Sequence, residues 1–257
     1  MSDALFVALV GVLGLFVGSF LNVCIYRLPL RRTVLWGRSH CPHCDRQIRA
    51  WENVPLVSWA LLRGRCAGCR AGISAQYPAV ELATGLLFAG GAWLYGPSLL
   101  LAARLLFAAA MVVLFMIDLQ HRILPNVITL PGIAAGLVFS LVLPPGLRDA
   151  VLGAVVCSLA LFGMGELVGR VLGKEALGFG DVKMTAMMGA FLGWQLTLVA
   201  LFLASFLGSA IGIALVAITR DRDYQIPLGS FLALGAIAAA AVGEPLLQWY
   251  VARMFPQ

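Results

Sequence analysis

The sequence predicts an all-α polytopic membrane protein, with about eight transmembrane helices and a cytoplasmic zinc-binding loop between helices 1 and 2. Two observations predict the membrane fold. Hydrophobic residues make up 61% of the chain and charged residues only 12%, about half the charged fraction of a soluble domain. Long apolar runs also recur from one end to the other. The third observation, which predicts the loop, is that two cysteine pairs lie in the one long polar stretch.

The first apolar run, 5–26, is too long for the apolar region of a signal peptide and lacks a basic start, so it predicts a retained membrane helix. Seven further runs lie at about 79–95, 98–118, 127–144, 150–170, 183–194, 196–219 and 228–252. The run at 183–194 is short for a span of about 20 residues. It is therefore tilted, half-inserted or joined to its neighbour through Gly193. The expected organisation is a first helix (1–26), a tetracysteine loop (27–78) and a multi-helix membrane domain (79–257).

Basic residues set the expected orientation in the membrane. The 27–77 loop alone holds nine arginines. On a path that alternates across the bilayer, all 18 lysines and arginines except Arg104, Arg148 and Arg253 fall on the side of this loop. Such a bias marks the cytoplasmic side and puts the N-terminus outside. The net charge of +6 is thus explained by membrane topology, and the expected partner is the lipid bilayer and not a nucleic acid.

The cysteine pairs predict a metal site. Cys41 and Cys44 form one C-x2-C pair, Cys66 and Cys69 form the second, and 21 residues separate the pairs. Four thiolates in a tetrahedral array suit zinc, and cytosolic thiols stay reduced. Because four cysteines close the coordination shell, the zinc is expected to be structural. The alternative is a redox pair or unused thiols.

Asp118 and Asp181 stand out among the acids of the apolar runs. Each falls where a predicted helix meets the cytoplasmic side, so the two share one membrane depth. Ionisable groups within membrane segments are energetically costly and usually face a cavity or a partner. Gly178 and Gly180 let the backbone before Asp181 approach another segment closely. The hypothesis is a proton-sharing catalytic pair. The alternative is that both are helix-end aspartates, with Asp181 capping a helix that starts at Val182.

Three other acids have plainer expected roles. Glu81 and Arg104 lie within apolar runs and are interpreted as an ion pair between helices, and Glu166, which is flanked by glycines, is interpreted as structural at a close helix contact. Glu52 is one of only two acids in the basic loop. It is a candidate for binding a cofactor or a substrate amine, but a surface salt bridge is the favoured role.

Several motifs together resemble one family, the bacterial type IV prepilin peptidases (leader peptidase/N-methyltransferases), which are membrane aspartic proteases of the G-x-G-D kind. The resemblance covers nearly the whole chain. It is carried by residues 16–29, the paired cysteines, Asp118 with Leu124-Pro125-Asn126, the segment 178–183, and the segment 226–233. In the last segment Leu228 and Ser230 depart from the family's usual pattern, P-F-G-P-F.

The resemblance implies two activities. One cleaves the basic leader of type IV prepilins or type II secretion pseudopilins after glycine, at the cytoplasmic face of the bacterial inner membrane, with Asp118 and Asp181 as the catalytic residues. The other N-methylates the new N-terminus with S-adenosyl-L-methionine, in the region of the N-terminal signature and the zinc loop. The sequence shows no strand-bounded G-x-G-x-x-G motif and predicts no residues that bind this cofactor.

Two other classes of protein were weighed against this interpretation. An ion-coupled membrane transporter with a zinc-bound cytoplasmic cap would use the two aspartates as ion ligands, but such proteins often have repeated halves, and none is apparent. A scaffold for pilus or secretion assembly would leave the G-x-G-D glycines and the common depth of the aspartates unexplained.

Overall fold

The computed structural model describes residues 3–34, 39–173, 177–219 and 227–254. Of the motif at 226–233, Ile226 lies outside these residues. Apart from two isolated β-bridges, the regular elements that are described are helical. The chain forms two compact units, Met1–Val113 and Leu114–Gln257, referred to below as the N-terminal and C-terminal units. Helix α4 (Leu99–His121) runs through the boundary between them.

Five helices of the described chain are long and apolar enough to cross a membrane. They are Asp3–Arg27, Leu99–His121, Leu147–Val171, Phe179–Ala214 and Leu228–Met254. At most 50% of the apolar window of any of them is buried within the protein, so a large apolar surface faces outward, as expected of helices that contact lipid. The predicted all-α multi-pass membrane class is confirmed, with five candidate spans where the sequence predicts about eight. Helix α5 (Asn126–Phe139) is apolar but shorter.

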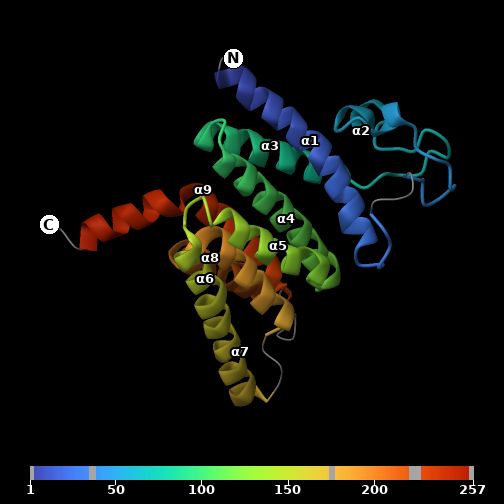
Figure 1. Ribbon diagram of the computed structural model, residues 1–257. Helices are drawn as coiled ribbons and strands as arrows, with labels where there is room; N and C mark the ends of the chain where they lie inside the picture. The colour runs from blue at the N-terminus through green and yellow to red at the C-terminus, as the bar shows by residue number, and fades with distance from the viewer. Residues whose placement is uncertain (1–2, 35–38, 174–176, 220–226, 255–257) are drawn as a thin grey trace. The chain divides into compact units, whose positions relative to one another are not determined.

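In the N-terminal unit, α1 (Asp3–Arg27) packs along α3 (Gln76–Tyr95) (Figure 1). Glycines make this contact close. A Cβ atom at Gly14 would lie 2.6 Å from Cβ of Phe88, and one at Gly18 would lie 2.7 Å from Cα of Glu81. Small residues at a helix contact allow such an approach in membrane proteins. The loop between the two helices contains a short 3₁₀ helix, η1 (Ala50–Asn53), and α2 (Val57–Leu61).

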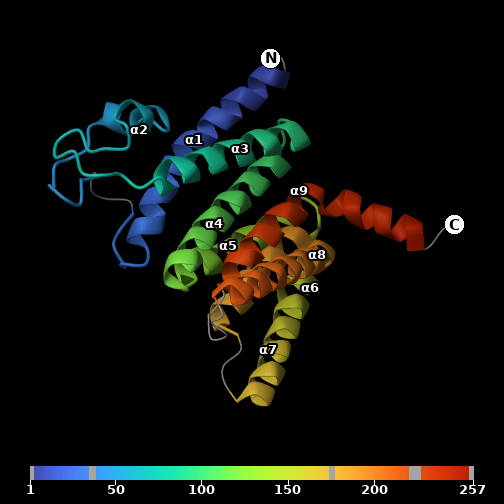
Figure 2. The same ribbon diagram turned by 180° about the vertical axis from the view of Figure 1, so that it is seen from behind.

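In the C-terminal unit, α8 (Phe179–Thr219) contacts the elements on either side of it in the sequence. These are α5, α6 (Leu147–Leu152), the π-helical turn η2 (Gly153–Cys157), α7 (Ser158–Leu172) and α9 (Leu228–Met254). Figure 2 shows α9 lying beside α8. This packing brings the starts of α8 and α9 near the end of α4, where the candidate site lies.

Gly193 divides α8 into two helical parts. Its dihedral angles, φ 76° and ψ 173°, are not helical, and this region of φ favours glycine. A Cβ atom there would also lie 2.8 Å from Cβ of Pro145. The short run at 183–194 lies in the first part of α8, which meets the second part at this break in the helix.

Candidate active site and cysteine cluster

Asp118 lies in the last turn of α4, and its side chain is bound by the start of α9. The backbone N–H of Ser230 donates to Oδ2 of Asp118 at 2.6 Å, and the Ser230 hydroxyl lies 2.9 Å from the same oxygen. The hydroxyl is also 3.2 Å from the Phe115 carbonyl oxygen. Both residues are buried, with Asp118 5% and Ser230 2% exposed. Two donors on one oxygen hold the carboxylate in a single orientation and stabilise its negative charge.

Asp181 lies in the first turn of α8 and is 9% exposed. Its backbone N–H donates to the Gly178 carbonyl at 3.0 Å, and its carboxylate lies beside Gly178 and within the electrostatic field of Asp118. The two aspartates named from the sequence are therefore brought together within the C-terminal unit. Since α8 begins at Phe179, Asp181 is not the residue before the helix, as the simple capping alternative requires.

Glycine makes the close approach of three segments possible. A Cβ atom at Gly229, in the first turn of α9, would lie 3.0 Å from both Cγ and Oδ2 of Asp118 and 3.1 Å from Cδ1 of Leu124. A Cβ atom at Gly180 would lie 3.1 Å from Cβ of Leu124. Leu124 thus packs against the residues that precede both Asp181 and Ser230, and a larger residue at either glycine would push the segments apart.

A polar contact adds to this packing at the start of α8. The Lys183 ammonium donates to Oδ1 of Asn126 at 2.9 Å and lies 4.8 Å from the centroid of the Phe179 ring. Asn126 is the first residue of α5 and follows the loop after Asp118. The contact ties this loop to the helix that carries Asp181.

The four cysteines named from the sequence form one cluster in the N-terminal unit. One sulfur from each of Cys41, Cys44, Cys66 and Cys69 lies within 4.8 Å of the others, and the Sγ atoms of Cys41 and Cys69 are 3.8 Å apart. Zinc–sulfur bonds of about 2.3 Å in a tetrahedron put neighbouring sulfurs about 3.8 Å apart. The donor set and its spacing therefore fit a four-coordinate metal ion of the zinc type.

The two cysteine pairs have the same local backbone. In the first, Cys41 N–H donates to the Arg46 carbonyl, and Asp45 N–H donates to the Cys41 carbonyl. In the second, Cys66 N–H donates to Ala71, and Arg70 N–H donates to Cys66. Asp45 and Arg70, each directly after the second cysteine of its pair, have positive φ angles of 53° and 62°. Each pair is thus a tight turn that aims two thiols at the same point.

The local surroundings give two of the cluster thiols, Cys66 and Cys69, very different pKa values. Backbone N–H groups of Cys69 and Gly68 lower the pKa of Cys66 to about 6. The pKa of Cys69 is raised to about 11, because burial and the neighbouring thiols together outweigh the favourable N–H of Ala71. Thiolates are the ligands that bind zinc, so Cys66 is prepared for a metal at neutral pH, and a cation would draw the remaining protons off the other thiols.

Glu52 forms the surface salt bridge favoured from the sequence. Its carboxylate accepts from the Arg49 backbone N–H at 3.1 Å and pairs with Arg46 at 2.7 Å. The Arg49 N–H, followed by the Arg46 guanidinium, lowers the pKa of Glu52. The pair closes the turn after the first cysteine pair.

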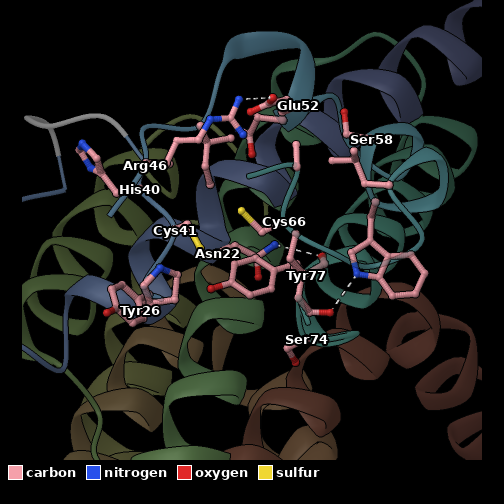
Figure 3. A pocket seen from close by; sticks show the side chains of 18 of the residues that line it. Asn22, Tyr26, His40, Cys41, Arg46, Glu52, Ser58, Cys66, Ser74 and Tyr77 are labelled. Atoms are coloured by element: carbon pink, nitrogen blue, oxygen red, sulfur yellow. Dashed lines mark hydrogen bonds and ion pairs between the residues drawn. The ribbon is translucent and has the colours of Figure 1, made fainter. Parts of the chain in front are cut away.

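A cavity of about 630 Å³ lies between the cysteine cluster and the helices α1 and α3 (Figure 3). Figure 3 shows Asn22, Tyr26 and Tyr77 on one side of Cys41 and Cys66, and the Arg46–Glu52 pair on the other. The Asn22 amide donates to the Tyr77 carbonyl at 3.0 Å. Its Oδ1 atom, in a residue only 4% exposed, has no hydrogen-bond partner among the described residues.

Sequence reasoning missed three polar residues of these sites. Ser230 is named from the sequence only as a departure from the family's pattern. Where that pattern has proline, the serine hydroxyl signals an added hydrogen-bond donor. Asn22 lies in the N-terminal signature but received no role. Glu81 was expected at a helix contact; it is 7% exposed, lines the cavity and accepts from the Leu56 backbone N–H at 2.8 Å.

Comparison with known proteins yields two family matches and close relatives. Residues 12–95 match the bacterial peptidase A24 N-terminal domain, and residues 105–213 match the type IV leader peptidase family. The chain is 40% identical to a prepilin leader peptidase/N-methyltransferase of Stutzerimonas stutzeri over 93% of this chain and 92% of that protein. It is 38% identical to proteins of the same name from Aeromonas hydrophila and Pseudomonas putida, in each case over 96% of this chain and 94% of the relative. No solved structure matches the chain.

Proposed function

Because the chain belongs to the type IV leader peptidase family, we propose that it is a bifunctional membrane enzyme that cleaves the leader of prepilins and N-methylates the new N-terminus. One observation above all supports the peptidase activity: Asp118, at the end of α4, and Asp181, at the start of α8, lie close together where α9 begins. Two buried carboxylates in each other's field cannot both ionise cheaply, so the pair holds one proton.

The contacts of the two carboxylates support a different role for each. Asp118, with two donors from Ser230, is the ionised member, and Asp181, whose carboxylate has no such pair of donors among the described residues, carries the proton. Asp118 removes a proton from a water molecule as the water oxygen bonds to the scissile carbonyl carbon. Asp181 gives its proton to the carbonyl oxygen. Collapse of the tetrahedral intermediate then breaks the C–N bond: the proton held by Asp118 goes to the leaving amine, and Asp181 takes back a proton from a hydroxyl of the intermediate, which restores the one-proton pair.

The substrate is a prepilin or a type II secretion pseudopilin, cut after glycine. Such a chain enters the bilayer as one hydrophobic helix with its basic leader in the cytosol, so its scissile bond lies at the cytoplasmic edge of the inner membrane. The bias of basic residues supports the same side for Asp118 and Asp181. Eight spans result when α3, α5 and the two parts of α8 on either side of Gly193 are counted as separate crossings.

The cysteine cluster holds a structural zinc ion. Its four thiols leave no open coordination position, so the metal shapes the loop and does not activate water. In this organisation residues 1–26 are the first membrane helix, residues 27–78 are the zinc loop associated with methylation, and residues 79–257 are the peptidase domain. S-adenosyl-L-methionine supplies the methyl group.

Aspartate substitutions test the peptidase half. Asp118→Asn and Asp181→Asn should each insert into membranes normally and each abolish cleavage of a purified prepilin. Asp149→Asn, the same change in the first turn of α6, should cleave at the wild-type rate. Cleavage at the wild-type rate by either site variant would exclude the proposed pair, and a wild-type protein without cleavage would favour the transporter or scaffold alternatives.

A further inference from the structure

The cavity in the N-terminal unit contains an unsatisfied acceptor. Asn22 follows Gly18 by one helical turn on α1, and close packing of α1 on α3 buries its side chain. Its Nδ2 group donates to the Tyr77 carbonyl, whereas no donor in the part of the chain that the structure describes reaches Oδ1. A buried oxygen without a donor is costly, and the great majority of such atoms have a partner in native proteins. The atom therefore points to a ligand that brings an N–H group.

A second group in the same cavity favours a positive charge. The Glu81 side chain is 7% exposed and lies in an apolar helix. It accepts from the Leu56 backbone N–H at 2.8 Å, and within the described parts of the chain no lysine or arginine pairs with it. Buried carboxylates are normally paired with a cation. Here the hydrogen bond from the Leu56 N–H orients the carboxylate but does not neutralise its charge, so the carboxylate can still pair with a cation.

The rest of the wall suits a flat or cationic organic molecule. Tyr26, Trp59 and Tyr77 line the cavity, and the Trp59 indole N–H donates to the Ile73 carbonyl at 3.2 Å, which holds the ring in place. Aromatic faces bind planar rings and attract organic cations. A volume of about 630 Å³ lies within the usual range for small-molecule sites.

We infer that this cavity is the site that binds S-adenosyl-L-methionine, with Asn22 Oδ1 accepting from one of its N–H groups and Glu81 facing its positive charge. The inference rests on the methyltransferase half of the proposed function. The ligand has the required features: a sulfonium, an ammonium group and a planar adenine with an exocyclic amine. Because Cys41 and Cys66 also line the cavity, a zinc ion in the cluster would stabilise one of its walls.

Direct binding tests the inference without measuring methylation. The purified full-length protein, in detergent and loaded with zinc, is titrated with S-adenosyl-L-methionine by calorimetry, and zinc content and melting temperature are measured on the same samples. Asn22→Ala removes the unsatisfied acceptor, and Glu81→Gln keeps an oxygen for the Leu56 N–H but removes the charge. Each should raise the Kd by about tenfold or more, the loss expected for one hydrogen bond to a charged or buried partner. Zinc should remain at one ion per chain.

Glu166→Gln is the matched control, since it makes the same change at an exposed carboxylate on α7 and should bind as the wild type does. If Asn22 has only a structural role, Asn22→Ala will lower the melting temperature without changing the Kd. Wild-type affinity in both Asn22→Ala and Glu81→Gln would overturn the site while leaving the proposed function intact. A wild-type protein that cleaves prepilin but does not bind the methyl donor would overturn the site together with the methyltransferase half.

Discussion

Ser230 donates both its backbone N–H and its hydroxyl toward one oxygen of Asp118, although 112 residues separate them in the chain. Ser230 is the third residue of α9, so the N-terminal end of that helix, with its partial positive charge, also faces the carboxylate. This arrangement distinguishes Asp118 from Asp181, whose carboxylate has no such pair of donors among the described residues. The first prediction follows from this difference.

Ser230→Ala should slow cleavage through kcat with little change in KM. The substitution removes the hydroxyl donor at 2.9 Å and keeps the N–H donor at 2.6 Å. A hydrogen bond to a charged group is worth about 1.5–3 kcal/mol, so kcat should fall about 10- to 100-fold. The measurement is steady-state cleavage of a purified prepilin. Ser140→Ala is the control, because its hydroxyl donates to the Ala190 carbonyl in the same unit, and it should lower stability without lowering kcat. An unchanged kcat in Ser230→Ala would contradict the role given to Ser230.

Gly229→Ala should impair cleavage by displacing Asp118. The added Cβ would lie 3.0 Å from Cγ and Oδ2 of Asp118 and 3.1 Å from Leu124 Cδ1, so the carboxylate or the start of α9 must shift. A displacement of about 1 Å at a catalytic group costs up to about 100-fold in rate. Gly163→Ala serves as the comparison, since a Cβ there meets nothing within 4 Å and should leave cleavage unchanged. Equal rates for the two variants would show that the contact at Gly229 has no effect on the aspartate.

Loss of the cluster thiols should separate the two activities. Cys41→Ser and Cys44→Ser each remove a ligand from the group whose sulfurs lie within 4.8 Å of one another. Zinc binding stabilises a loop that has few core residues of its own, so each variant should lose zinc, become more sensitive to proteolysis within residues 39–73 and lose methylation, while cleavage persists. Metal analysis and limited proteolysis measure the effect. Cys157→Ser, whose thiol lies outside the cluster in η2, should keep its zinc. A wild-type zinc content in both Cys41→Ser and Cys44→Ser would exclude the cluster as the metal site.

Acid should release the zinc. The pKa of Cys66 is lowered to about 6 by the backbone N–H groups of Cys69 and Gly68. A group with a lowered pKa contributes its stabilisation above the ordinary value and loses it as the pH falls through the folded value. Zinc should therefore be held at neutral pH. Because a bound cation displaces the thiol protons, it should be released only below about pH 6, and the stability of the zinc loop should fall with its release. A dye that reports free zinc measures the release. Full retention far below pH 6, or loss during alkaline titration alone, would contradict this prediction.

The sequence by itself predicted most of what depends on local spacing and composition. Two C-x2-C pairs predict a four-thiol cluster because each pair needs only one tight turn to aim two thiols. Long apolar runs predict membrane helices because backbone groups in lipid must be satisfied within each segment. The family motifs named the two aspartates. The count of spans was less predictable, because α5 is short and α8 continues through Gly193.

Contacts between distant segments were decided only by the tertiary structure. No local pattern states that Ser230 binds Asp118 or that Leu124 packs against both Gly180 and Gly229, because these contacts depend on how α4, α8 and the start of α9 pack together. The same holds for Asn22, whose free oxygen appears only once α1 and α3 are packed and Tyr77 has used its amide. The sequence by itself therefore determined the membrane class, the four-cysteine cluster and the two acids, whereas side-chain packing decided which donors face Asp118 and which buried acceptor keeps no partner among the described residues.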